Sequence, residues 1–193
     1  MRYSAEHKQR TRERIVRAAS RRFRSHGTEG VAIADLMRDL RLTHGGFYRH
    51  FGSKKGLVVE AFESALKEHG DRAIGAIAKA PPGREMRALI DAYLDPKHCD
   101  DIAGGCPVAA LASEIARRPK GSRGPFVQAL RSHIHRMEQY MPGATIEERR
   151  QKTIALFTGM AGTLTVARAF TDQQDRRAIL EGAKKFFSAA VQS

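Results

Sequence analysis

The fold of this chain is decided by a short stretch, residues 43–57, which reads THGGFYRHFGSKKGL. Thr43 is a favourable helix N-cap, because its hydroxyl can accept a hydrogen bond from an N–H of the first turn. The two glycines that follow remove side-chain bulk from that turn, so the helix can approach another surface closely. Phe47 and Phe51 lie four residues apart on one helix face, and we expect both in a small core.

The remaining side chains of this stretch are suited to phosphate. Tyr48, Arg49 and His50 point away from the core and offer the hydroxyl, guanidinium and imidazole groups that hold a DNA backbone. Ser53 is expected to cap the next helix, and Lys54 follows in its first turn, where the helix dipole disfavours a cation unless an anion binds. The alternative interpretation is a core helix with a solvated basic face.

Two helices are predicted upstream of this stretch. Apolar residues at helical spacing predict one helix over residues 10–26 and a short second helix over residues 33–40. Only Arg41 and Leu42 separate the second helix from Thr43. Three helices with a tight turn before the last form a helix-turn-helix, in which the third helix enters the major groove.

Residues 10–62 resemble the TetR/AcrR family of bacterial transcriptional repressors, which carry a similar Thr/Ser-x-Gly-x-Phe/Leu-Tyr-x-His-Phe-x-x-Lys-x-x-Leu string. The resemblance implies that Thr43, Gly45, Tyr48, His50 and Lys54 contact operator DNA, the last three mainly through phosphates. Together with the residues chosen by side-chain chemistry and position, the candidate DNA-binding residues are Thr43, His44, Gly45, Tyr48, Arg49, His50 and Lys54.

Two positions depart from the family pattern. Ala32 stands where the family usually has a Thr or Ser that caps the second helix. The absence of a capping hydroxyl at this position should weaken the cap by about 1 kcal/mol. Arg41 replaces the usual glycine of the turn. It either strains a left-handed backbone position or adds a phosphate contact.

The charge distribution agrees with nucleic-acid binding. The 193 residues carry a net charge of +13, and residues 1–60 hold 14 Lys and Arg against 6 Asp and Glu. Such a basic end also fits an anionic membrane surface, but no lipidation motif or signal peptide supports that reading. The longest charge-free run has 15 residues, short of the roughly 20 that span a bilayer. We therefore expect a cytoplasmic protein without a membrane partner, and two cysteines predict no disulfide framework.

Helical periodicity throughout the chain predicts an all-α fold, with an N-terminal helix-turn-helix DNA-binding domain over residues 1–52. A long helix starting at Ser53 should join it to a helical effector-binding and dimerisation domain over residues 53–193. Proline, glycine and small polar residues then bound the further helices expected at 85–94, 107–117, 125–140, 146–170 and 175–191.

The C-terminal helices offer a candidate dimer interface and pocket. Residues 153–167 are apolar nearly all round, and Gly159 and Gly162 would let another helix approach. Burial inside the monomer is the alternative to a homodimer contact completed by Phe186, Phe187, Ala190 and Val191. Bundles also bind small molecules between helices, and the side chains that could line such a pocket include Tyr93, Phe126, Met137, Phe157 and Met160.

Cys106 is the candidate effector or redox residue. Pro107 fits the first position of a helix, so Cys106 is its N-cap, where the dipole and free N–H groups favour a thiolate, although apolar burial would oppose it. The segment GGCPVAAL resembles a subset of TetR/AcrR-type regulators, some of which respond to electrophiles or oxidants through a cysteine. One alternative is a structural buried cysteine. The other is a metal site, whose candidate ligands would be His98, Cys99, Asp100, Asp101 and Cys106, but their spacing matches no standard zinc pattern. Cys99 could resolve an oxidised Cys106, but we expect it to be inert.

These features predict a ligand- or redox-responsive transcriptional regulator, most simply a repressor. It would bind a palindromic operator in double-stranded DNA as a homodimer and be released by a small-molecule effector or by an electrophile at Cys106. Neither a metal nor another cofactor is expected. A non-specific architectural DNA-binding protein is the first alternative, and an enzyme with Cys106 as nucleophile is the second, for which no oxyanion-hole motif or phosphate loop is present.

Overall fold

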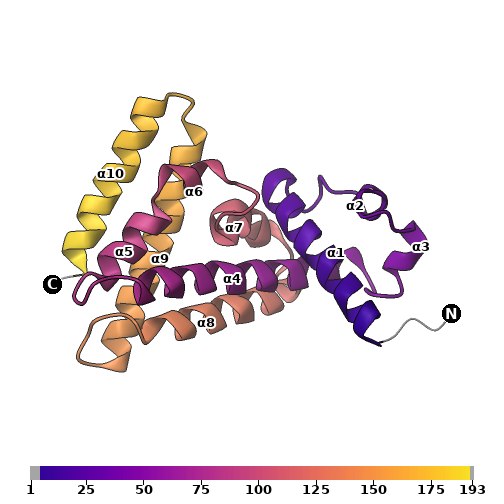
Figure 1. Cartoon of the computed structure of the whole chain (residues 1–193), viewed down its shortest axis with the longest axis horizontal. Helices are drawn as coiled ribbons and strands as arrows, with labels where there is room; N and C mark the ends of the chain where they lie inside the picture. The colour runs from indigo at the N-terminus through magenta and orange to yellow at the C-terminus, as the bar shows by residue number, and fades with distance from the viewer. Residues whose placement is uncertain (1–4, 192–193) are drawn as a thin grey trace.

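The computed structural model of the chain describes residues 5–191, and all regular structure in that range is helical. The prediction of an all-α fold is therefore confirmed (Figure 1). The elements in chain order are α1 (Ala5–His26), α2 (Ile33–Asp39), α3 (His44–Phe47), α4 (Lys54–Ala78), α5 (Glu85–Tyr93), α6 (Pro96–Asp100), α7 (Pro107–Arg117), the 3₁₀ turn η1 (Lys120–Ser122), α8 (Gly124–Glu138), α9 (Ile146–Ala169) and α10 (Gln173–Ala190).

The three N-terminal helices form a small domain with the first half of α4. α1 packs along α4, and α2 packs against α1 and α3. The core of this domain is apolar and almost fully buried, with Phe23 from α1, Leu36 from α2, Phe47 from α3 and Leu57 from α4. Removing these side chains from water is the main force that holds so short a helix as α3 in place.

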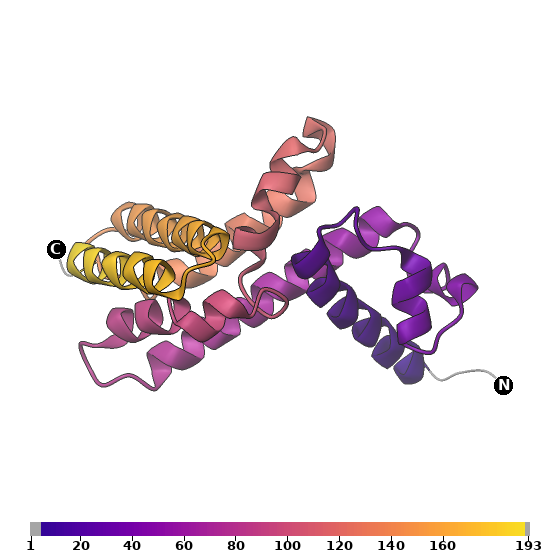
Figure 2. The same ribbon diagram turned by 90° about the horizontal axis from the view of Figure 1, so that it is seen from above.

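The larger domain is a bundle arranged around the second half of α4. α5 and α8 lie along α4, while α9 packs against α8, α7 and α10 (Figures 1 and 2). α7 lies between the two domains and contacts α1 as well as α4 and α9. Because α4 packs in both domains, the proposed boundary between residues 52 and 53 remains a prediction.

Local signals set most helix ends. Gly27 adopts a left-handed φ of 73° after α1, which an L side chain adopts only with strain. Thr145 and Asp172 cap α9 and α10 by accepting hydrogen bonds from backbone N–H groups of the first turn. No helix within residues 5–191 is both long and apolar enough to cross a membrane.

The structure corrects several predicted bounds. α1 begins at Ala5 rather than at residue 10, and regular helix in α3 spans only four residues before the chain turns. α6 was not predicted; it forms because Asp95 caps it and Pro96 occupies its first turn. The turn η1 was also missed, since a three-residue segment carries no periodic signal.

Candidate functional site

The predicted recognition segment is built as its sequence indicated. The Thr43 hydroxyl accepts a hydrogen bond from the Gly46 amide at 3.2 Å, which caps α3. Phe47 and Phe51 are buried and stack with their ring centroids 5.4 Å apart. These two rings anchor the segment, so its polar residues are held outward by the core beneath them.

The other candidate DNA-binding side chains lie at the surface. Tyr48 is 63% exposed, and Thr43, His44 and Arg49 are exposed as well. The His44 and Tyr48 rings meet edge to face with centroids 5.7 Å apart. These exposed residues lie within or directly beside α3, at the end of the molecule that α3 forms (Figure 1).

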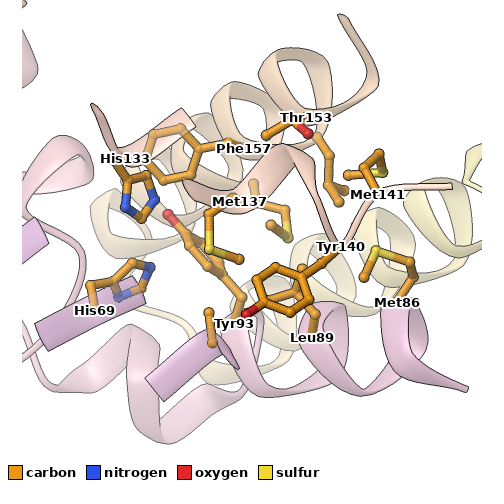
Figure 3. Close-up of a pocket in the computed structure, with 13 residues that line it drawn as sticks. His69, Met86, Leu89, Tyr93, His133, Met137, Tyr140, Met141, Thr153 and Phe157 are labelled. Carbon is orange, nitrogen blue, oxygen red and sulfur yellow. The ribbon is translucent and has the colours of Figure 1, made fainter. Parts of the chain in front are cut away.

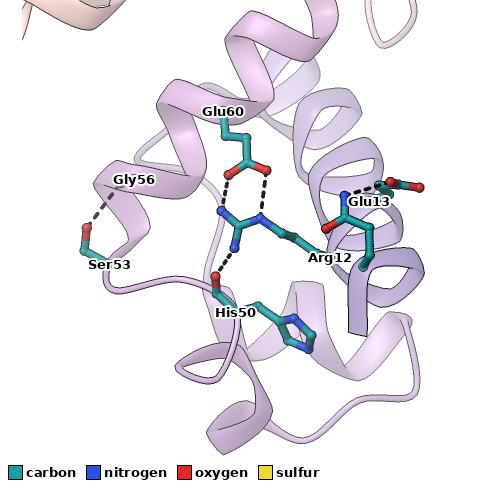
Figure 4. Close-up of polar contacts among 7 residues, drawn as sticks. Arg12, Glu13, His50, Ser53, Gly56 and Glu60 are labelled. Carbon is teal, nitrogen blue, oxygen red and sulfur yellow. Dashed lines mark hydrogen bonds and ion pairs between the residues drawn. The ribbon is translucent and has the colours of Figure 1, made fainter. Parts of the chain in front are cut away.

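Arg12 of α1 fixes the loop between α3 and α4. Its guanidinium donates to the His50 carbonyl oxygen and to both carboxylate oxygens of Glu60 on α4 (Figure 4). It also lies 4.3 Å from the centroid of the Phe51 ring, within the range of a cation–π contact. Sequence reasoning missed this residue, because its three partners come from distant parts of the chain.

The predicted start of α4 is confirmed, and Lys54 has a partner that the sequence did not reveal. The Ser53 hydroxyl accepts from the Gly56 amide at 3.1 Å (Figure 4). Lys54 Nζ lies 3.7 Å from a carboxylate oxygen of Glu29, whose side chain is largely exposed. An ion pair in such a solvated position is weak, so a phosphate could compete with Glu29 for the ammonium group.

His50 is half-buried, and its Nδ1 has no hydrogen-bond partner among the described residues. Burial lowers the pKa of the imidazole, and the nearby cations Lys8, Arg12 and Arg49 lower it further. The side chain is therefore neutral at physiological pH. While it stays neutral, its contact with a phosphate is a hydrogen bond rather than an ion pair.

The two departures from the family pattern have visible consequences. Ala32 occupies the N-cap of α2 and makes no side-chain capping bond. Arg41 adopts a φ of 57°, the left-handed conformation that glycine would adopt without strain. Arg41 therefore occupies the strained left-handed backbone position that was one of the two interpretations of this residue. The Arg41 side chain is exposed, just before α3 in the chain.

Polar contacts join the small domain to the bundle. The Thr28 amide and hydroxyl, just after α1, both donate to the Glu114 carboxylate on α7, and Arg118 donates to the Thr28 hydroxyl at 2.7 Å. Buried Arg24 of α1 donates to the Gly105 carbonyl oxygen at 2.7 Å. These contacts therefore couple the position of α1 directly to that of α7 and of the loop before α7.

The bundle contains a pocket between α4, α5, α8 and α9 (Figure 3). It includes four of the five residues expected to line it, Tyr93, Met137, Phe157 and Met160. Phe126 is instead buried against Phe62, with ring centroids 5.5 Å apart. The full lining is His69, Ala73, Met86, Leu89, Tyr93, His133, Met137, Tyr140, Met141, Thr153, Leu156, Phe157 and Met160.

Three histidines gather at one end of this pocket. The His69 ring lies 5.4 Å from His98 and 6.3 Å from His133 between centroids. Burial lowers the pKa of all three, that of His69 well below its usual range and that of His133 to about 4. His133 lines the pocket, whereas His135 is exposed and contacts Glu138. No three His, Cys, Asp or Glu side chains within residues 5–191 form a group that could hold a metal ion.

His98 links the pocket to the loop that touches α1. Its Nδ1 lies 2.5 Å from the Tyr93 carbonyl oxygen, and its Nε2 accepts from the Cys106 amide at 3.1 Å. A carbonyl can only accept and an amide N–H can only donate, so these partners fix the neutral Nδ1-protonated tautomer.

Cys106 is the N-cap of α7, as predicted, but the expected thiolate is not favoured. The residue is 0% exposed, and burial raises the pKa of its thiol, although the nearby Tyr93 hydroxyl and the amides of Val108 and Ala109 act to lower it. Desolvation of a charged sulfur outweighs the helix N-terminus here. Cys99 is also buried, and Arg176 lies 3.4 Å from its sulfur.

The run 153–167 forms the middle of α9 and has two different faces. One face, including Leu156, Met160 and Leu164, is buried in the monomer. Gly159 belongs to this interior, since a Cβ there would lie 2.5 Å from the Phe187 ring of α10, whereas a Cβ at Gly162 would meet no atom within 4 Å. The outer face is uncharged from residue 154 to 166, so burial within the monomer accounts for only part of the run.

Comparisons with known proteins agree with this geometry. Residues 15–61 match the family described as bacterial regulatory proteins, tetR family. An uncharacterized HTH-type transcriptional regulator of Mycobacterium tuberculosis is 33% identical over 105 residues, which cover 53% of this chain and 52% of that protein. The chain thus matches about half the length of that relative.

Two further similarities cover more of the chain. The HTH-type transcriptional regulator LmrA of Bacillus subtilis is 26% identical over 145 residues, covering 74% of this chain and 77% of LmrA. A TetR family transcriptional regulator from Cytophaga hutchinsonii shares the fold with a TM-score of 0.74 at 18% identity, over 97% of this chain and 98% of that one. Residues 15–61 therefore form an N-terminal domain of the TetR family of bacterial regulatory proteins, and the chain as a whole has the helical fold of TetR family structures.

Proposed function

We propose that this regulator is a repressor that binds a palindromic operator as a homodimer and is released by a small molecule bound in the pocket of its C-terminal domain. The observation that carries the proposal is the outward display of Thr43, His44, Tyr48 and Arg49 over the buried pair of phenylalanines. Short helices held this way place their N-terminal residues against base edges and the rest against phosphates.

The DNA contacts divide by position. Thr43 and His44 stand at the N-terminal end of α3 and would read bases, with Gly45 allowing close approach. Tyr48, His50 and Lys54 would hold phosphates, the last by exchanging Glu29 for the DNA backbone.

The proposed dimer uses the outer faces of α9 and α10. Large apolar side chains are exposed there, including Ile154, Val166, Phe170 and Phe186, the last 68% exposed. Open space around Gly162 would admit a helix of the second subunit. Pairing these faces buries apolar surface that the monomer leaves in water.

An effector in the pocket would act on α1 through the contacts already described. Tyr93 lines the pocket, its carbonyl oxygen faces His98, and the loop that follows holds Arg24 through Gly105. An effector that binds one arrangement of the bundle preferentially by about 2.7 kcal/mol would lower the affinity for DNA about 100-fold.

The test is selection of binding sites from a random double-stranded DNA library at physiological salt. We expect two inverted half-sites, bound at least about 10³-fold more tightly than unrelated DNA. Tyr48→Phe should weaken binding to the selected site, whereas Lys79→Ala, at the far end of α4, should not. Equal affinity for every duplex would contradict the proposal and indicate an architectural DNA-binding protein.

The dimer has a separate test. Phe186→Glu should shift the protein from dimer to monomer in sedimentation velocity, because it places a charge in the proposed contact. Val127→Glu replaces an exposed apolar residue of α8 and serves as the matched control. A monomeric wild-type protein would overturn the dimer.

Modification of Cys106 is the alternative trigger for release. A buried, protonated thiol must first become accessible and ionised, so this route needs a local opening around α7. Treatment with a quinone should then release operator DNA from wild type and leave Cys106→Ser bound. Release of both proteins alike would exclude the thiol route.

A further inference from the structure

The pocket in the C-terminal domain has a chemical character that specifies its ligand more closely than the proposed function, on which this inference rests. We propose that it takes a neutral, largely apolar molecule bearing one hydroxyl group, with that hydroxyl placed between His69 and Tyr93. The apolar body would lie among the methionines at the other end of the pocket.

The lining carries no charged side chain to pair with an ionic ligand. Its residues are aliphatic, aromatic, methionine, threonine and histidine, without Lys, Arg, Asp or Glu. The two histidines in the lining are neutral at physiological pH, since burial lowers the pKa of His69 and of His133. A carboxylate or ammonium group would have to be desolvated here without a counter-ion, at a cost of several kcal/mol.

Two buried polar atoms in the lining lack hydrogen-bond partners. Nδ1 of His69 and the hydroxyl oxygen of Tyr93 are both inaccessible to solvent and make no hydrogen bond of ordinary geometry within the described residues. The Tyr93 hydroxyl is also influenced by the thiol of Cys106, but a thiol is only a weak hydrogen-bond partner. Buried polar atoms are nearly always paired in folded proteins, so these two point to a ligand or a water.

The two atoms belong to one small region. The His69 and Tyr93 rings meet edge to face with centroids 5.1 Å apart. Figure 3 shows the hydroxyl end of Tyr93 beside His133, with His69 close by at the same end of the pocket and Met86 and Met141 at the other end. One polar group of a ligand can therefore serve both residues while its apolar remainder extends toward the methionines.

A hydroxyl group fits these atoms better than other neutral polar groups. It donates and accepts at once, so it pairs with either tautomer of a neutral imidazole and with a phenol at the same time. A ketone only accepts, and an unsubstituted hydrocarbon leaves both protein atoms unpaired.

The size of the ligand is set by side chains that can move. The cavity volume is only about 30 Å³, room for one or two waters. Met86, Met137, Met141 and Met160 surround it, and unbranched methionine side chains repack readily around a guest. The ligand would therefore open the pocket as it binds. Such an opening would shift α5 and, through His98, the loop before α7 that contacts α1.

The test uses matched probes that differ in one group. 4-Propylphenol, propylbenzene and 4-propylbenzoate are titrated calorimetrically into the full-length wild type, into Tyr93→Phe and into His69→Phe. We expect the phenol to bind about tenfold more tightly than propylbenzene, the benzoate to bind more weakly than the phenol, and the preference for phenol to shrink to about threefold or less in each variant. His135→Phe, at an exposed position of α8 outside the lining, is the control that should keep the preference.

Three results with these probes would overturn the inference. Equal affinity for phenol and propylbenzene would mean that a water satisfies His69 and Tyr93, and stronger binding of the benzoate would mean an anionic ligand. Absence of binding by all three probes would exclude this ligand class. Phenol binding without release of the selected DNA would refute the proposed effector coupling and leave the ligand class standing. Specific DNA binding with no phenol binding would refute the ligand class and leave the proposed DNA-binding function standing.

Discussion

The buried histidine His133 makes the stability of this protein depend on pH in a calculable way. Its pKa is lowered from 6.5 to about 4, first by burial and then by Arg136. In the unfolded chain the imidazole takes up a proton near pH 6.5, whereas in the folded protein it stays neutral until about pH 4. The free energy of unfolding therefore falls as the pH falls through this window.

The magnitude follows from the two pKa values. Each pH unit between them costs about 1.4 kcal/mol for one proton, so His133 alone contributes a loss of about 3 kcal/mol between pH 6.5 and pH 4. Above pH 6.5 both states are neutral and the contribution of His133 to stability is fully present. His69 and His98 have lowered pKa values as well, so the wild-type slope should exceed that of a single proton.

The measurement is urea unfolding at a fixed protein concentration and at several pH values between 7.5 and 4.5. Replacing His133 with Phe should reduce the slope of unfolding free energy against pH by up to about 1.4 kcal/mol per unit. His135→Phe, an exposed position on the same helix, should keep the wild-type slope. An unchanged slope in His133→Phe would refute the reasoning, whatever the stability of the variant at pH 7.5.

Three further predictions concern the DNA-binding domain and its junction with the bundle. Lys54→Ala should weaken binding to specific and unrelated DNA alike and lower the slope of log affinity against log salt by about one; a salt series that leaves the slope unchanged would remove Lys54 from the phosphate contacts. Arg41→Gly should raise the unfolding free energy by about 1 kcal/mol, because glycine adopts a φ of 57° without strain; denaturant unfolding that shows a less stable variant would contradict this. Thr28→Val should lower stability by about 1 kcal/mol in the same assay, since it removes the hydroxyl that joins Glu114 to Arg118; wild-type stability would mean that this junction contributes nothing.

The local features of the DNA-binding domain were predictable from sequence. The caps at Thr43 and Ser53, the stacked pair Phe47 and Phe51, and the order of the first three helices all depend on residues close together in the chain. Helix caps and helical periodicity act over three or four residues, so they can be identified without knowledge of the rest of the fold.

Other properties depended on distant residues meeting. Arg12 fixes the His50 loop through partners 38 and 48 residues away, and Lys54 pairs with Glu29 across a domain. No periodic pattern indicates such contacts. They arise only when α1, α3 and α4 are packed together.

The sequence by itself determined the helical class, the helix-turn-helix and the surface that is proposed to face DNA, because these follow from local capping, periodicity and charge. Only the tertiary structure decided the environment of Cys106, whose burial overrides the helix N-terminus, and the meeting of His69 and Tyr93 from α4 and α5 around one pocket. The physical reason is that desolvation and unpaired polar atoms depend on what surrounds a side chain in space, and that is settled when the helices pack.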